Sequence, residues 1–209
     1  MTNGRNVVGE QIPAPFSGCL SKRLLDILLG TTLLIVAIPV LLVAMAVACI
    51  SSRGSALFLQ TRRGLAGKRF RIFKLRTMRR GNQRRREVTA VGRWLRATSA
   101  DELPQLFNVL RGEMSLVGPR PHPIILDLKY WEAIPDLRLR YAMKPGITGL
   151  AQINGARGPV HSAEDIRRRL SFDLAYMRQW SVILDLRIIV LTPLRGVLPV
   201  LWRSLQRLT

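Results

Sequence analysis

The longest feature of the hydrophobic pattern is an uncharged stretch from Ile27 to Ser52, ILLGTTLLIVAIPVLLVAMAVACISS. It is long enough to cross a bilayer and too apolar for an ordinary soluble helix. A cleaved signal peptide would have a shorter apolar region and a small-residue cleavage site. The pattern therefore predicts a retained membrane helix, which we place at residues 21–53, after a flexible leader over residues 1–20.

Two features bear on how this helix meets the membrane. Basic residues flank both ends, with Lys22 and Arg23 before it and Arg53 after it, whereas a simple span carries them mainly on the cytoplasmic side. Pro39, near the middle, removes a backbone hydrogen bond and bends the helix. This combination favours a re-entrant helix that enters and leaves by one leaflet. The alternative is a kinked helix that passes straight through, because spanning helices tolerate proline.

Shorter patterns follow the apolar stretch. ALFLQ and KRFRIFKLR, joined by the glycine-containing TRRGLAG, predict a small β-hairpin. Amphipathic periodicity predicts helices around residues 124–131, 164–180 and 184–194. Such helices either pack in a core or lie in the membrane interface. The expected fold is mainly α with a small β-hairpin (α+β), in which interfacial amphipathic helices surround a compact unit.

The charge balance adds a requirement for an anionic partner. The chain has 33 Lys and Arg against 13 Asp and Glu, a net charge of +20, which indicates nucleic acid, anionic lipid or a phosphorylated substrate. Two cysteines offer neither a disulfide framework nor a zinc spacing, which favours a cytoplasmic setting. The two histidines, His122 and His161, have no metal-ligand spacing and are interpreted as ordinary polar residues.

Two acids stand side by side in the stretch TSADELPQ, Asp101 and Glu102. Ser99 and Glu102 fit a capping box, but Pro104 fits the first turn better if Asp101 is the N-cap of a helix through LPQLFNVL. Helix-terminal amides and nearby Arg96 are expected to keep Asp101 ionised and to attract a phosphate. The residues alone are compatible with a cap and with a nucleophilic carboxylate.

A rigid turn follows in SLVGPRP, where Pro119 and Pro121 flank Arg120. Prolines on both sides hold the backbone of the arginine, and a fixed guanidinium suits bidentate phosphate binding. A turn with a solvated arginine is the alternative. The later loop KPGITGLAQINGARG contains neither the dinucleotide glycine motif nor the Walker pattern.

Taken in order, FKLRTM, RWLRATSADELPQLFNVLRGEMSLVGPRP, KPGITGLAQINGARG and SFDLAYMRQWSVILDLRIIVLT resemble the bacterial sugar transferase family, the monotopic polyprenol-phosphate phosphoglycosyltransferases. The resemblance covers residues 22 to 192. It implies transfer of a sugar phosphate from a UDP-sugar to undecaprenyl phosphate, with Mg2+ and a covalent intermediate, at the start of surface polysaccharide synthesis. It also implies a monotopic enzyme among the lipids of the bacterial inner membrane, with residues 54–209 as a catalytic domain at the cytoplasmic face.

The resemblance assigns roles to individual residues. Asp101 matches the family's nucleophile and Glu102 its partner acid. At Pro39 the family often has a preceding serine, whereas this chain has Ile38, so a hydroxyl that could bond the freed backbone is missing. The remaining matches are basic positions around the phosphates and acids implied in metal binding or active-site support: Lys74, Arg96 and Arg120 for the former, and Glu102, Asp173 and Asp185 for the latter.

The identity of the sugar follows from two further stretches, AQINGARG and IRRRLSFDLAYMRQWSVILDL, which look closer to the hexose-transferring branch. We expect UDP-glucose first and UDP-galactose second. The rival hypothesis is a non-catalytic, membrane-anchored basic module that binds anionic lipid or nucleic acid. Nucleic acid is not expected as a partner, because no RRM, KH or C2H2 pattern is present. The sequence leaves open the polysaccharide and the oligomeric state, a homo-oligomer included.

Overall fold

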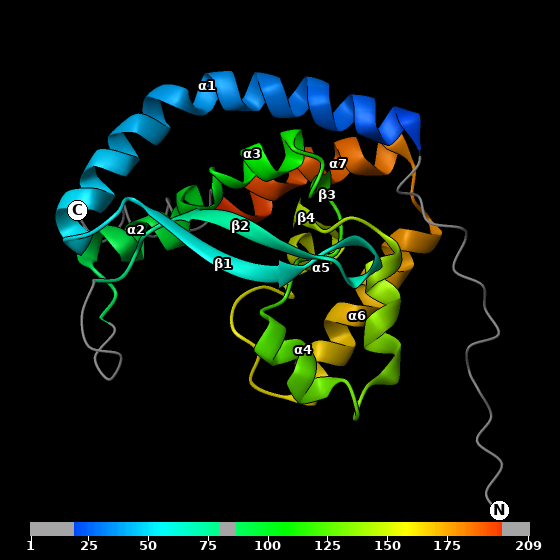
Figure 1. Ribbon diagram of the computed structural model, residues 1–209. Coiled ribbons are helices and arrows are strands. Elements are labelled where there is room, and N and C mark those ends of the chain that lie inside the picture. Colours follow the sequence, from blue (N-terminus) through cyan, green and yellow to red (C-terminus); the bar gives the residue numbers. More distant parts are fainter. Residues whose placement is uncertain (1–18, 80–86, 198–209) are drawn as a thin grey trace, which may run out of the picture.

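The apolar stretch forms most of one helix, α1 (Leu20–Ser52), in the computed structural model, which describes residues 19–79 and 87–197. At about 1.5 Å per residue the helix is about 50 Å long, and Figure 1 shows it arching over one side of the molecule. Pro39 lies inside the helix without dividing it into two arms. The expected bend is thus a curve in a continuous helix. The predicted leader lies almost wholly outside the described residues.

Both ends of α1 are bound to the rest of the protein. Near its start, the Lys22 ammonium donates to the Val117 carbonyl at 3.0 Å and pairs with Asp185 at 2.7 Å. One turn later, the Asp26 carboxylate accepts from the Leu116 N–H at 2.8 Å. Near its end, small and branched side chains pack into a buried cluster with the strand and helix beneath: Leu41, Ala44, Ala48, Leu75 and Leu95. A single folded unit therefore contacts α1 at both ends.

The predicted β-hairpin is confirmed. Strands β1 (Leu57–Arg63) and β2 (Arg69–Leu75) pair antiparallel, with Leu57 opposite Leu75. β1 is longer than expected, because the segment interpreted as part of the connection continues the strand as far as Arg63. The turn is therefore confined to residues 64–68, and the hairpin extends below α1 in Figure 1.

The segment around the acid pair differs from the expected helix start. Helix α2 (Ala90–Thr98) ends on Ser99, which has a left-handed backbone with φ of 59°. A single 3-10 turn, Ala100–Glu102, follows at once, and helix α3 (Gln105–Leu110) begins after Pro104 without a side-chain cap. Asp101 lies inside the 3-10 turn, so the prediction that it is an N-cap is wrong. Because the 3-10 turn follows α2 directly, Asp101 does not have the extended backbone that an N-cap residue typically adopts.

The remaining elements complete the unit around α3. A short parallel sheet, which the pattern did not predict, pairs β3 (Ser115–Val117) with β4 (Gly146–Thr148). The three predicted amphipathic helices are confirmed as α4 (Ile124–Tyr130), α6 (Ala163–Arg178) and α7 (Val182–Thr192). Short turns join them: a 3-10 segment (Pro135–Ala142), α5 (Leu150–Ile153) and a π turn (Pro193–Val197).

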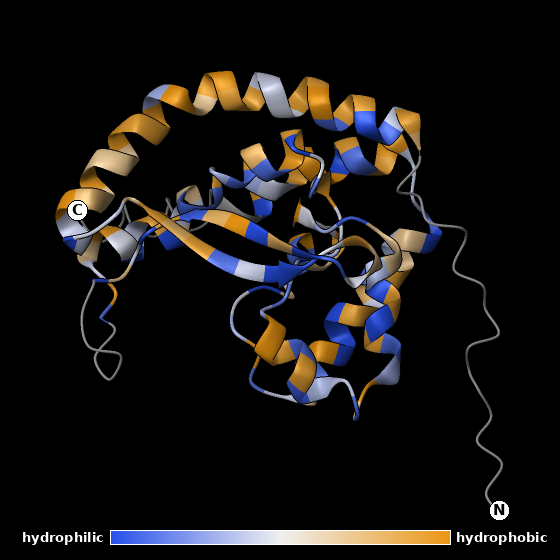
Figure 2. Cartoon of the chain, in the orientation of Figure 1, coloured by the Kyte–Doolittle hydropathy of each residue, from blue (hydrophilic) through white to orange (hydrophobic). Residues whose placement is uncertain are grey.

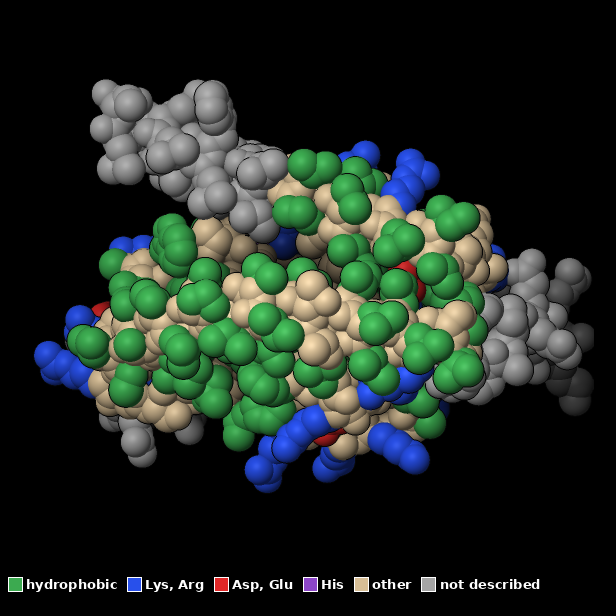
Figure 3. All heavy atoms as spheres, turned by 90° about the horizontal axis from the view of Figure 1, so that it is seen from above, with side chains coloured by type: hydrophobic (Ala, Val, Ile, Leu, Met, Phe, Trp, Pro, Cys, Tyr) green, Lys and Arg blue, Asp and Glu red, His purple; other side chains and the backbone are tan. Residues whose placement is uncertain are grey.

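The hydrophobic surface is concentrated on the side of α1. Figure 2 shows α1 as the most continuously apolar element, and Figure 3, which looks down on it, shows hydrophobic side chains across this face with Lys and Arg at the rim. By length and composition α1 could cross a membrane. Large apolar side chains stay exposed on α1, on α3 and on α7, among them Val36, Leu42, Phe107, Ile183 and Val190.

Candidate functional site

The acid pair lies where three segments meet. Asp101 is buried, with 8% of its surface exposed. The neighbouring Glu102 carboxylate accepts from the Lys74 ammonium on β2 at 2.7 Å. It also accepts two hydrogen bonds from the Arg120 guanidinium, one of them at 3.0 Å. The sequence-predicted residues Asp101, Glu102, Lys74 and Arg120 therefore form one cluster.

The two acids have opposite pKa shifts. Burial raises the pKa of Asp101 to about 6, and the charges of Lys74, Arg120 and Arg96 offset only part of that effect. Burial also opposes ionisation of Glu102, but the charges and hydrogen bonds of Arg120 and Lys74 outweigh it and hold its pKa well below the usual range. At neutral pH both carboxylates are ionised. Glu102 is engaged by two cations, whereas no described residue donates a hydrogen bond to the Asp101 carboxylate.

Arg96 and Arg157 approach the pair from two other directions. The Arg96 guanidinium donates to the Thr77 hydroxyl at 2.8 Å, which fixes it beside the chain that follows β2. Arg157, in the AQINGARG loop, donates to the Ser99 hydroxyl at 3.1 Å and is close enough to feel the charges of Arg120 and Glu102. The sequence analysis predicted Arg96 as a site residue. It did not predict a site role for Arg157, which lies in the quoted loop AQINGARG.

Asp173 is linked to Arg120 through Arg140. Its buried carboxylate accepts from the Arg140 guanidinium at 2.8 Å, and the same guanidinium donates to the Arg120 carbonyl at 2.6 Å. Asp173 therefore acts on the cluster through Arg140, a residue that the sequence analysis missed.

Asp185 lies in a different network. Its carboxylate accepts from Lys22, from the Tyr176 hydroxyl at 2.6 Å and from the Trp180 indole at 3.1 Å. Lys22 also donates to the Val117 carbonyl at the end of β3, and the Tyr176 hydroxyl oxygen lies 3.2 Å from the same carbonyl oxygen. The structure thus joins Asp185 to α1 and β3 and does not place it against the acid pair.

Asn108 fixes α3 to the hairpin. It is fully buried; its carbonyl oxygen accepts from the Phe73 N–H at 3.0 Å and its amide donates to the Arg71 carbonyl at 2.8 Å. These bonds hold the Asp101 segment in register with Lys74. A polar residue within the apolar run LFNVL was the signal that could have revealed it.

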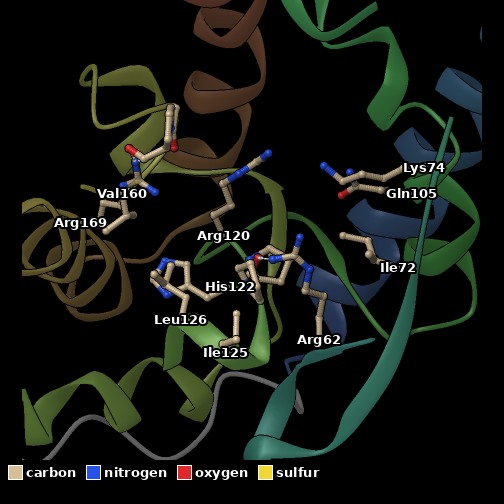
Figure 4. A pocket seen from close by; sticks show the side chains of 14 residues that line it. Arg62, Ile72, Lys74, Gln105, Arg120, His122, Ile125, Leu126, Val160 and Arg169 are labelled. Atoms are coloured by element: carbon tan, nitrogen blue, oxygen red, sulfur yellow. Dashed lines mark hydrogen bonds between the residues drawn. The ribbon is translucent and has the colours of Figure 1, made fainter. Parts of the chain in front are cut away.

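A pocket of about 320 Å3 opens beside the cluster (Figure 4). Lys74 and Arg120 belong both to its lining and to the acid-pair cluster. Figure 4 shows Gln105 beside Lys74 on one side, Arg169 on the other, and Arg62 and His122 between them. The polar lining residues that the sequence analysis missed as part of a site are Arg62, Gln105, His122 and Arg169.

The described residues contain no group of three or more His, Cys, Asp or Glu side chains that could hold a metal ion. Glu102 is engaged by two cations, and Asp101 is the carboxylate of the pair to which no described residue donates a hydrogen bond. Mg2+ typically keeps several waters and is bound through one or two carboxylates plus substrate phosphates. Of the two acids, Asp101 is therefore the one that could contribute a ligand to a magnesium ion bound together with substrate phosphates.

The arrangement as a whole can perform chemistry on a phosphorus atom. A buried, ionised carboxylate can act as a nucleophile. Lys74, Arg96 and Arg120 can stabilise negative charge on phosphoryl oxygens, and their effect is strengthened by burial. The pocket provides room for the rest of a phosphorylated molecule next to that carboxylate.

Comparison with known proteins places this site in a family. Residues 17–198 match the family model described as bacterial sugar transferase. A Caulobacter vibrioides protein named UDP-glucose:undecaprenyl-phosphate glucose-1-phosphate transferase is 47% identical over 185 residues, 83% of this chain and 68% of that protein. A Klebsiella pneumoniae protein of the same name is 45% identical over 184 residues, 84% of this chain and 40% of that protein.

A third relative is similar in length. Exopolysaccharide production protein PSS of Rhizobium leguminosarum bv. phaseoli is 40% identical over 183 residues, 80% of this chain and 90% of that protein. By contrast, the chain spans about 40% of the length of the Klebsiella relative. The matched region contains the acid pair, its cations and the pocket, and it confirms the resemblance seen in the motifs. The chain belongs to the bacterial sugar transferase family.

Proposed function

We propose that the protein is a phosphoglycosyltransferase that moves glucose 1-phosphate from UDP-glucose to undecaprenyl phosphate, releases UMP and so initiates a surface polysaccharide. The observation that carries this proposal is the buried Asp101 carboxylate beside a Glu102 that binds both Lys74 and Arg120. The names of the Caulobacter and Klebsiella relatives support the two substrates, and the name of the Rhizobium relative supports the pathway.

In the first step, an oxygen of Asp101 attacks the β-phosphorus of UDP-glucose. The bond from that phosphorus to the bridging oxygen breaks, UMP leaves with the electron pair, and glucose phosphate becomes bound to Asp101 as an acyl phosphate. Lys74, Arg96 and Arg120 neutralise the charge that builds on the phosphoryl oxygens and the leaving group. Glu102 keeps two of these cations in place. A magnesium ion carried by the diphosphate would add to this charge neutralisation.

In the second step, an oxygen of undecaprenyl phosphate attacks the same phosphorus. The bond to Asp101 breaks, the carboxylate is regenerated, and the product is undecaprenyl diphosphate glucose. Each step forms one phosphorus–oxygen bond and breaks another, so no oxidant or further reactant is needed. Asp173 has a positioning role through Arg140, and Asp185 holds the end of β3 through Val117.

We further propose that the enzyme is monotopic at the cytoplasmic face of the inner membrane, with α1 entering and leaving by one leaflet. The support is that both ends of α1 contact the same unit, through Lys22 and Asp26 at one end and Ala48 at the other. A straight span would carry one end to the far side of the bilayer. Apolar side chains exposed on α3 and α7 would enter the same leaflet.

The proposal is tested with detergent-solubilised protein, UDP-glucose and Mg2+, first without and then with undecaprenyl phosphate. Without the lipid, we expect UMP release close to one per enzyme and radiolabelled glucose retained on the protein; with it, continuous release. Asp101→Asn should lower UMP release on the order of a thousandfold or more and abolish labelling, whereas Asp136→Asn, away from the cluster, should do neither.

Two further arms sharpen this assay. UDP-galactose is expected to be a weaker donor than UDP-glucose, and turnover of N-acetylhexosamine donors alone would contradict the assignment of the sugar. Chelation of Mg2+ should stop turnover without changing the melting temperature of the donor-free protein, because the metal is expected to arrive with the donor. Equal UMP release by Asp101→Asn would show that Asp101 is not the nucleophile, and no release by the wild type with any donor would return the protein to a membrane-anchored basic binding module.

A further inference from the structure

The pocket beside the acid pair has a strongly cationic lining. Arg62 and Arg169 line it together with Lys74 and Arg120. Among the described residues that line it, none is Asp or Glu. A concave site with several cations and no carboxylate is suited to an anion.

Two neutral side chains in the same lining carry polar nitrogens without a partner. Gln105 and His122 are 1% and 5% exposed, and the Nε2 atom of each is buried without a hydrogen-bond partner. A buried polar group without a partner is rare and costly in a folded protein. Two of them in the lining of one pocket indicate that a ligand supplies the partners.

The environment of His122 defines its protonation state. The Nδ1 atom lies 2.5 Å from a nitrogen of the Arg140 guanidinium, which can only donate. The same Nδ1 atom lies 3.4 Å from an oxygen of the buried Asp127 carboxylate, so the ring meets both a donor and an acceptor on that side. Burial, followed by the charge of Arg140, lowers the pKa of His122 to about 3, so the ring is neutral. His122 thus contributes a neutral ring to the lining of the pocket, and its Nε2 atom is the ring nitrogen without a partner.

We propose that this pocket is a second phosphate subsite, which holds the α-phosphate of the nucleotide while the β-phosphorus reacts at Asp101. Arg62 and Arg169 supply charge, Gln105 supplies a neutral N–H donor, and His122 supplies a neutral ring nitrogen. Lys74 and Arg120 line the pocket and also bind Glu102, so a diphosphate can extend from one site into the other. This inference rests on the proposed function and assigns the leaving UMP to a place in the fold.

The position of the pocket favours the nucleotide over the phosphate of the lipid acceptor. No described residue of α1 lines it. A separate apolar cavity of about 420 Å3 is lined by Ile38, Leu41 and Met45 of α1 together with Phe107. Lipid would approach from the side of α1, whereas the cationic pocket belongs to the part of the unit reached by a soluble nucleotide.

The test measures equilibrium binding of UMP and of uridine to the detergent-solubilised full chain by calorimetry. His122→Asn keeps an acceptor for Arg140 and removes Nε2; Gln105→Leu removes the amide. Each variant should weaken UMP binding about tenfold or more and leave uridine binding unchanged. The matched controls are His161→Asn and Gln179→Leu, at exposed positions outside the pocket, which should bind UMP as the wild type does.

The outcomes separate this inference from the proposed function. If the wild type turns over UDP-glucose but all variants bind UMP equally well, the subsite is wrong and the proposed function stands. If the variants lose uridine and UMP equally, the pocket holds the base instead. If UMP binding is unchanged but the KM for undecaprenyl phosphate rises, the pocket takes the lipid phosphate. A wild type that neither binds UMP nor turns over UDP-glucose overturns both proposals.

Discussion

At the scale of single residues, the site separates two adjacent carboxylates by their surroundings. Glu102 has two cations within hydrogen-bonding distance and is held ionised. Asp101 interacts with the charges of the same cations but forms no hydrogen bond with them. Burial is the largest influence on its pKa and raises it to about 6. A carboxylate that is poorly solvated and not hydrogen-bonded is a better nucleophile than one engaged by two cations. This difference supports the proposed roles, in which Asp101 is the nucleophile and Glu102 positions Lys74 and Arg120.

Ionised Asp101 should lower the stability of the protein. Its folded pKa is raised above the unfolded value near 3.8, so its contribution to stability is greatest below pH about 4 and is lost as pH rises through about 6. Asp101→Asn has no such dependence. At pH 8 the variant should be more stable by on the order of 1 to 3 kcal/mol, and the difference should shrink as pH falls toward 4.

Thermal unfolding in detergent between pH 4 and 8 measures this difference, with Asp136→Asn as the control. A variant that is less stable than the wild type at pH 8 would mean that the surrounding cations outweigh burial at Asp101. A gain in stability together with the loss of UMP release would identify a residue kept for chemistry at a cost in stability.

At the scale of elements, the cations are positioned by close backbone packing. Helix α2 approaches the chain after β2 so closely that a Cβ on Gly92 would lie 2.0 Å from the Thr77 carbonyl oxygen. Thr77 in turn accepts the hydrogen bond from Arg96. In α1, by contrast, a Cβ on Gly30 would make ordinary contacts of 3.5 Å with Leu110 and Val109. Gly92 and Gly30 therefore serve as a test position and its control, because both lie in helices and only at Gly92 would an added side chain collide with backbone.

Gly92→Ala should force Thr77 away and move Arg96 with it. We expect a loss of stability of about 1–3 kcal/mol and a fall in kcat/KM of about tenfold or more, because small displacements of a catalytic group are costly. Gly30→Ala should keep full activity and gain up to about 1 kcal/mol from helix propensity. Melting temperatures and UMP release report both effects; a fully active Gly92→Ala would show that the position of Arg96 is unimportant.

Elements defined by local pattern could be predicted, and those defined by long-range contact could not. The apolar run, the hairpin and the three amphipathic helices follow from periodicity, which is a local property. The parallel pairing of Ser115–Val117 with Gly146–Thr148 joins two three-residue strands far apart in the chain, too short for any periodic signal. The prediction that Asp101 is an N-cap was wrong because Ser99, two residues earlier, adopts a left-handed conformation that sequence rules assign mainly to glycine.

The residues of the site also fall into two sets, those that sequence motifs predict and those whose roles depend on long-range contacts. Motif resemblance brought together Asp101, Glu102, Lys74 and Arg120, and the structure shows them in one cluster. The second set of residues acts through tertiary contacts: Arg140 links Asp173 to Arg120, and Asn108 links α3 to β2. Such residues have no motif of their own, since their roles depend on which backbone groups lie beside them after folding.

At the scale of the whole molecule, α1 and the unit beneath it behave as one body. Lys22 and Asp26 at the start of α1 are buried among groups of β3 and α7, where a charged side chain without partners would be strongly unfavourable. Releasing this end, so that it could cross a bilayer, would leave those partners unpaired. These contacts therefore support the proposed topology, in which both ends of α1 stay on the side of the unit.

Two positions that flank α1 test this topology: Cys19, which precedes the helix, and the exposed Ser55, which follows it. In a Cys49→Ser background, we would compare a variant that retains Cys19 with a Cys19→Ser, Ser55→Cys variant. In the proposed topology both ends of α1 face the cytoplasm, so a membrane-impermeant maleimide should label neither cysteine in intact spheroplasts and both in inside-out vesicles. Labelling of only one of them from each side would show that α1 spans the bilayer and that the contacts of Lys22 and Asp26 do not hold in the membrane.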